Sequence, residues 1–288
     1  MSIITEPLIS RTPWKAPRVS IALIQLLAVP HGAADYVEQI GAVVERDSRL
    51  SAAGRVTNLS ALGGPMGPAS IDALIDRADA ERFVSMVTAN QLLAVFVPSS
   101  PAMCELWYHA ISVATIAREI VAFHRLGDLA PERAYLAGLF HDVGAMVMAL
   151  AASEDYRSML QLNSLRDDSI RRIERERFGS DHVEIGAQVA AALGVPEDIR
   201  QAVALHHDRA ACTEAAPHLA VLRLAMFVEW AVRERDCRES LERALAGGSP
   251  LVRALRIDAS RSPFLPGRLD ELAVAADKSI LDLGVPVN

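Results

Sequence analysis

Apolar residues recur at helical spacing through almost the whole chain, while the signals that build strands are absent. The sequence contains neither an Asn-Gly nor an Asp-Gly turn, and it has no alternating run of β-branched residues. Ala, Leu, Arg and Glu, which favour helices, dominate instead. Proline and glycine clusters, such as residues 98–101 and 194–196, separate one apolar block from the next. The pattern predicts an all-α fold built from many helices of ordinary length.

The composition indicates a chain with a large buried core. Its 288 residues are 51% hydrophobic and 23% charged, so it can bury enough apolar surface to fold without external staples. The three cysteines are widely spaced and fit neither a disulfide framework nor a thiolate zinc site. The first residues lack the basic patch and apolar stretch of a secretory signal. We therefore expect a cytoplasmic protein.

Charge and helix breakers argue against two classes of partner. With 29 basic and 36 acidic residues the net charge is −7, and no cluster of Lys and Arg could neutralise a row of phosphates, so no nucleic-acid partner is expected. Residues 83–104 carry no charge and are long enough to span a bilayer. Asn90 and Gln91 interrupt this stretch, and two prolines break its last third. We expect a buried helix ending at Val97, a loop after it, and no membrane partner.

The distribution of histidines divides the chain. Only His31 lies before residue 105, so any histidine chemistry belongs to the second half. The last helix is expected to start near Arg268 and to pack on the body through an apolar stripe of Leu269, Leu272, Ala276, Ile280 and Leu283. The expected organisation is an N-terminal extension at 1–16, a main domain at 17–235 made of a helical part at 17–101 and a histidine-bearing part at 102–235, and a C-terminal helical extension at 236–288.

Several histidines occupy helix positions that are predicted to point inward. His109 shares an apolar face with Val113 and Ile116. His141 and Asp142 lie within residues 135–148, which read as one helix so apolar that it must be largely buried. Burying an ionised aspartate there costs several kcal/mol of desolvation free energy, unless a metal, a histidine or a hydrogen-bond network compensates the charge.

Two further histidine positions are set by helix ends. His182 follows Asp181, which together with Glu184 forms a capping-box-like helix start. The next helix is expected to run from Pro196 to the pair at 206 and 207. Adjacent helical residues diverge by about 100°, so both histidines of that pair can face one centre only from the end of a helix.

Two interpretations of these side chains stay open. A single core histidine is usually structural, because one donor and one acceptor satisfy a neutral imidazole. Five of them beside a buried carboxylate also form a set that suits Fe, Mn, Ni or Zn, although the residue types neither choose among these metals nor establish that one is bound. The candidate metal ligands are His109, His141, Asp142, His182, His206 and His207.

The sequence around these residues resembles the HDOD branch of the HD superfamily, the HD-related output domain of bacterial signalling proteins. The resemblance covers roughly residues 17–235 and implies an N-terminal helical subdomain packed on an HD-like helical bundle. It also implies a regulatory module that acts through signalling protein partners or a small ligand. The likeness is carried by Leu-Ala-Gly-Leu-Phe-His-Asp-Val-Gly at 136–144, by His109, by residues 176–186 and 193–196, by His206-His207, and by N-terminal elements at 44–50 and 57–60.

The catalytic relatives in this superfamily, the HD and HD-GYP phosphohydrolases, hold metals at positions that match the six candidate ligands. Here the last aspartate of those enzymes is replaced by Met226, their lysine is replaced by Ala145, and nothing like Gly-Tyr-Pro follows His207. Loss of an anionic, hard ligand weakens a hydrolytic metal centre. Glu229, three residues after Met226, could substitute as the last carboxylate; the alternative is a surface residue beside Trp230.

These features predict a non-catalytic regulatory module of HDOD type. The alternative is a metal-dependent phosphohydrolase acting on a nucleotide or a cyclic dinucleotide, in which case a nucleotide is a further partner. A third reading is a scaffold that binds neither metal nor nucleotide. The sequence does not specify an oligomeric state.

Overall fold

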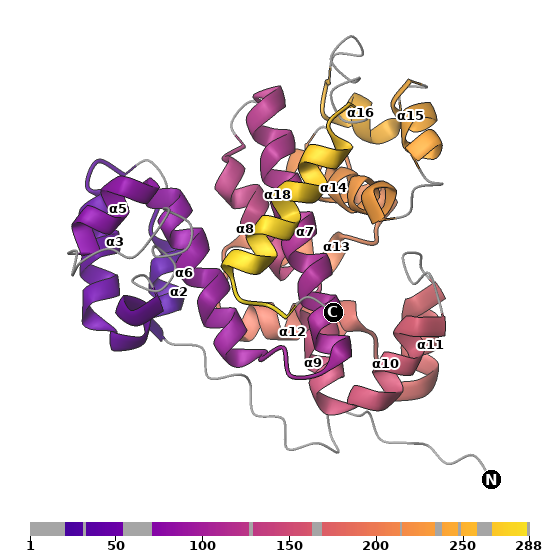
Figure 1. Cartoon of the computed structure of the whole chain (residues 1–288), viewed down its shortest axis with the longest axis horizontal. Coiled ribbons are helices and arrows are strands. Elements are labelled where there is room, and N and C mark those ends of the chain that lie inside the picture. Colours follow the sequence, from indigo (N-terminus) through magenta and orange to yellow (C-terminus); the bar gives the residue numbers. More distant parts are fainter. Residues whose placement is uncertain are drawn as a thin grey trace.

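Helices make up all the regular structure that the computed structural model describes, which confirms the all-α prediction. Figure 1 shows one group of helices at the N-terminal end and a larger body that contains the rest. The expected extension at 1–16 and the motif at 57–60 lie outside the described residues. The described residues are 21–30, 33–53, 71–126, 129–162, 169–213, 215–233, 238–246, 249–257 and 267–286.

The N-terminal group is built from α2 (Ile21–Ala28), α3 (Tyr36–Arg46), α5 (Ile71–Ala78) and α6 (Ala80–Val95). Helix α6 joins this group to the body through contacts with α8 (Pro131–Phe140). It ends two residues before the expected Val97, because a residue that precedes a proline disfavours helical backbone. The Phe96 carbonyl at this end accepts a hydrogen bond of 2.6 Å from the Trp107 indole.

The centre of the body is α7 (Pro101–His124), which packs closely against α8. Gly138 makes this approach possible, since a Cβ atom placed on it would lie 2.5 Å from the Cα atom of Ala114. Helix α8 is followed at once by α9 (Val143–Ala151). Residues Pro131–Ala151 together are long and apolar enough to cross a membrane, but 83% of the 18-residue stretch that passes this test is buried inside the protein, as in the core of a soluble domain.

The remaining helices of the body follow in chain order and surround α7 to α9 (Figure 1). Helix α9 and the later helix α12 (His182–Ala192) cross at a pair of glycines, where a Cβ atom on Gly144 would lie 1.9 Å from the His182 carbonyl oxygen and 2.5 Å from the Gly186 nitrogen. The elements are α10 (Ser153–Leu162), α11 (Ser169–Phe178), α12 (His182–Ala192), α13 (Glu197–Leu205), a 3-10 turn (Arg209–Ala211) and α14 (Pro217–Arg233).

The C-terminal segment contributes α15 (Arg238–Ala246), α16 (Pro250–Ala254) and α18 (Leu269–Asp282). Helix α18 lies against α7 and α14 in Figure 1 and in its contacts. Its expected start near Arg268 is confirmed, and four members of the predicted stripe are buried: Leu269, Leu272, Ala276 and Ile280.

Candidate metal centre

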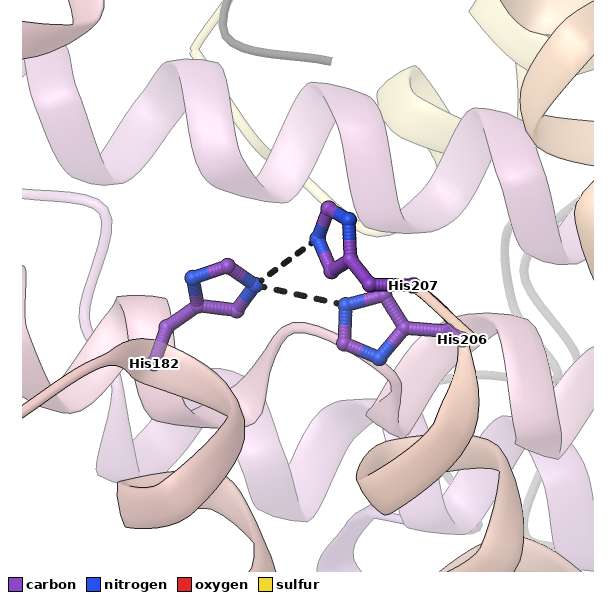
Figure 2. A group of neighbouring side chains, drawn as sticks. All are labelled: His182, His206 and His207. Carbon is purple, nitrogen blue, oxygen red and sulfur yellow. Dashed lines mark hydrogen bonds between the residues drawn. The ribbon is translucent and has the colours of Figure 1, made fainter. Parts of the chain in front are cut away.

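Three histidine side chains meet where the start of α12 approaches the end of α13. Figure 2 shows the imidazoles of His182, His206 and His207 with their Nε2 atoms turned toward one another. The Nε2 atom of His182 lies 3.3 Å from that of His206 and 3.1 Å from that of His207. Three nitrogen donors therefore converge within the body of the protein.

A second group forms beside the first, from α7 and from the junction of α8 and α9. The Nε2 atoms of His109 and His141 are 3.2 Å apart. They lie 3.6 Å and 3.4 Å, respectively, from Oδ2 of Asp142. Two imidazoles and one carboxylate oxygen make up this group.

Asp142 connects the two groups because its two oxygens face different histidines. While Oδ2 faces His109 and His141, Oδ1 lies 3.3 Å from the Nε2 atom of His206 and 3.6 Å from that of His182. All six predicted ligands are thus brought together around a single carboxylate. Such a carboxylate can bridge two metal ions.

Local structure explains how neighbours in sequence reach the same centre. Residues 135–148 were expected to form one helix, and that expectation is wrong: α8 ends at Phe140, and Asp142, with φ −104° and ψ 22°, precedes α9. The interruption allows His141 and Asp142 to face the same centre, whereas in a continuous helix they would diverge. The expected helix end at His206 is confirmed, since α13 stops at Leu205. The predicted cap of α12 is also confirmed, because the Asp181 carboxylate accepts from the Glu184 amide.

Hydrogen bonds on the outer side of the rings fix the orientation of three imidazoles. The Nδ1 atoms of His141 and His206 lie 2.6 Å and 2.9 Å from the carbonyl oxygens of Gly138 and Val203. The Nδ1 atom of His182 lies 2.7 Å from Oε2 of Glu174. Each of these acceptors requires a proton on Nδ1, so the Nε2 atom of each neutral ring presents a lone pair to the centre.

The electrostatics keep most of this donor set ready to bind a cation. Burial lowers the pKa of His141 to about 3 and that of His207 to about 2, so both rings are neutral at neutral pH. Burial alone would raise the pKa of Asp142, but the adjacent histidines, His141 above all, outweigh it and hold this pKa well below its usual range. Burial would likewise lower the pKa of His182, yet the Glu174 carboxylate raises it overall.

The donor set fits a metal ion. In His182 and His206 the Nε2 atoms lie 3.3 Å apart. When both rings are neutral with a proton on Nδ1, two lone pairs face each other, and a proton or a metal ion between them relieves the repulsion. Ligands about 2.1 Å from an ion are about 3.0 to 3.4 Å apart in octahedral or tetrahedral geometry. The donor separations in both groups lie close to that range. The residues can therefore hold divalent transition metals, with Asp142 between two sites.

Comparison with protein families matches residues 15–209 to the HDOD domain. The chain belongs to the HDOD domain family. This confirms the resemblance found in the sequence. No curated protein matches the chain.

Solved structures share the fold of this HDOD protein at low sequence identity. An HDOD domain protein of unknown function from Geobacter sulfurreducens has a TM-score of 0.63 and 22% identity, over 92% of this chain and 95% of its own. A protein from Shewanella amazonensis, provisionally named a phosphohydrolase, has a TM-score of 0.67 and 18% identity, over 93% of this chain and 94% of its own. A provisionally named signal transduction protein from Marinobacter aquaeolei has a TM-score of 0.70 and 19% identity, over 94% of this chain and 59% of its own.

The HDOD protein departs from the expected ligand set at α14. Glu229 is 1% exposed, so the alternative of a surface residue does not hold. Its Oε2 atom lies 3.3 Å from Nδ1 of His109, on the side of the ring opposite to the Nε2 atom that faces the other donors. The position of the missing acid, Met226, is partly buried among apolar side chains.

Sequence reasoning missed one carboxylate of the HDOD centre. Glu174 is fully buried and accepts from the amide of His182 as well as approaching its ring, and it receives the Tyr156 hydroxyl at 2.7 Å. The sequence does contain a signal for it. Ile170, Glu174 and Phe178 recur every four residues on an otherwise charged helix, which places a carboxylate on the buried face of α11.

Proposed function

We propose that this protein is a cytoplasmic HDOD regulatory domain that binds two transition-metal ions and acts on a signalling protein partner. The observation that carries the metal assignment is the position of Asp142, whose two oxygens face two separate groups of imidazole Nε2 atoms. His109, His141 and Asp142 would hold one ion. His182, His206 and His207, with the other oxygen of Asp142, would hold the second.

Charge supports ion binding at this depth. Two divalent cations bring four positive charges, and Asp142 removes one of them. The buried carboxylates of Glu174 and Glu229, which contact the outer nitrogens of His182 and His109, offset two more. Such outer carboxylates orient ligating histidines and increase their basicity.

The regulatory assignment follows from what the centre lacks for hydrolysis. Where the HD and HD-GYP phosphohydrolases have a lysine, this chain has the buried, uncharged Ala145. No cation therefore reaches the centre from that position. Met226 supplies no charge, and the carboxylate whose oxygens face the Nε2 atoms of both groups is that of Asp142. A centre of this kind binds metal more readily than it stabilises the charge of a transferring phosphoryl group.

Metal titration of the purified full chain tests the proposal. We expect two ions per chain, with Zn²⁺ and Ni²⁺ bound more tightly than Mn²⁺ and much more tightly than Mg²⁺, because imidazole dominates the donor set. At a free metal concentration 100 times the Kd, one bound ion should stabilise the fold by about 2.7 kcal/mol. Elemental analysis and thermal unfolding with and without chelator measure both quantities. A chain that stays free of metal and keeps the same Tm after addition of each cation would contradict the proposal.

A phosphohydrolase remains a second candidate, and one observation favours it. His109 and Asp142 keep 16% and 15% of their side-chain surface exposed, so the group they form with His141 borders solvent. Three protein donors leave coordination positions open for water and a phosphate. If this candidate holds, metal-loaded protein should hydrolyse nucleotides or cyclic dinucleotides, and H141A should abolish turnover. Full metal loading without turnover with Mn²⁺, Fe²⁺, Ni²⁺ or Zn²⁺ would favour the regulatory role.

A further inference from the structure

We propose that Glu229 is a positioning residue that sets the metal affinity of the group formed by His109, His141 and Asp142. The inference rests on the proposed metal binding. Glu229 lies on α14, beyond residue 209 where the match to the HDOD domain ends. The segment that follows the matched residues would therefore complete the centre.

The place of each histidine in its helix explains which ones need a carboxylate. His141 and His206 lie at the C-terminal ends of α8 and α13, and each uses the carbonyl three residues earlier as its Nδ1 acceptor. The last carbonyls of a helix have no intrahelical partner, so they are free to accept such a bond.

The two histidines that a glutamate approaches do not lie at the C-terminal end of a helix. His109 lies in the middle of α7, where the helix itself uses the carbonyl groups, and His182 is the first residue of α12. A buried glutamate from another helix approaches the Nδ1 atom of each ring: Glu229 lies 3.3 Å from His109, and Glu174 lies 2.7 Å from His182. Each group of donors therefore contains one histidine whose outer nitrogen contacts a buried carboxylate.

The surroundings of Glu229 support a charged, oriented carboxylate. Its other oxygen lies 3.4 Å from Nη1 of Arg233, one turn further along α14. Arg233 also packs over the ring of Tyr108, the residue adjacent to His109. The negative charge that Met226 does not supply directly would reach the centre through the His109 ring, since a carboxylate at Nδ1 makes Nε2 a stronger donor.

The test is a stepwise Co²⁺ titration of the full chain, followed by visible absorption and calorimetry. In E229Q we expect the step that fills the His109 group to weaken by about 10- to 100-fold, the usual effect of losing an outer-shell partner. The step that fills the His182 group should keep its affinity. E105Q is the matched control, because Glu105 lies 3.9 Å from the same Arg233 but is half exposed and does not contact a ligand. Equal weakening of both steps, or no change in either, would overturn the proposal.

A second measurement separates this proposal from the metal assignment. Long-range ¹H–¹⁵N NMR of the metal-free chain should show His109 with its proton on Nδ1, and E229Q should shift that ring toward a mixture of tautomers while its circular dichroism is unchanged. If the wild-type chain binds no Co²⁺, the proposed function fails, and the tautomer shift alone decides whether Glu229 positions His109. An unchanged tautomer in E229Q would refute the positioning role whatever metal is bound.

Discussion

D142N is expected to abolish tight binding at both metal sites. The two oxygens of Asp142 face different groups of histidines, at 3.4 Å from Nε2 of His141 on one side and at 3.3 Å from Nε2 of His206 on the other. An amide keeps the shape of the side chain but removes the charge and one acceptor oxygen. We expect affinity to fall by more than about 100-fold at each step, above the loss typical of an outer-shell partner. Calorimetric titration with Zn²⁺ measures it.

The matched control for this variant is D155N, which makes the same chemical change at an exposed position on α10. It should bind two ions with wild-type affinity. D142N should still fold, since asparagine fills the same volume, and circular dichroism checks this. If D142N loses only one ion and binds the other at full strength, Asp142 does not bridge, and the two groups of histidines are independent sites.

Local signals in the sequence were sufficient for the parts of the centre that depend on helix ends. The Asp181 cap predicts where α12 begins, and hence the position of His182. The sequence also predicts a helix that begins near Pro196 and runs to the 206–207 pair, and α13 ends at Leu205, immediately before that pair. Hydrophobic spacing alone also placed His109 on the inward face of α7. Each of these inferences needs only the geometry of one helix.

The parts that sequence reasoning missed depend on contacts between helices. No proline marks the break between α8 and α9 at His141 and Asp142 in the sequence. Val143 and Gly144 follow instead, and Gly144 is needed for the close contact with α12. For Glu229 the sequence left two alternatives, a substitute carboxylate or a surface residue beside Trp230, and only the packing of α7 against α14 places it beside the outer side of the His109 ring. Burial of a carboxylate is a tertiary property, so spacing along one helix could not decide its role.

G144A is expected to be the most destabilising single substitution that leaves the ligands themselves intact. The added Cβ atom would lie 1.9 Å from the carbonyl oxygen of His182 and 2.5 Å from the nitrogen of Gly186, and both are backbone atoms that cannot rotate away. Helices α9 and α12 would have to separate, at a cost of about 3 kcal/mol or more. Chemical denaturation should report this as a lower free energy of unfolding in metal-free protein.

The same separation would move Asp142, at the start of α9, away from His182, at the start of α12. Metal binding should therefore weaken in G144A together with stability. G267A is the matched control, because a Cβ atom on Gly267 meets no heavy atom within 4 Å, and it should change neither quantity by more than about 0.5 kcal/mol. Wild-type stability in G144A would mean that the two helices tolerate a wider spacing. If affinity is also unchanged, the glycine contact does not set the distance between the two groups of ligands.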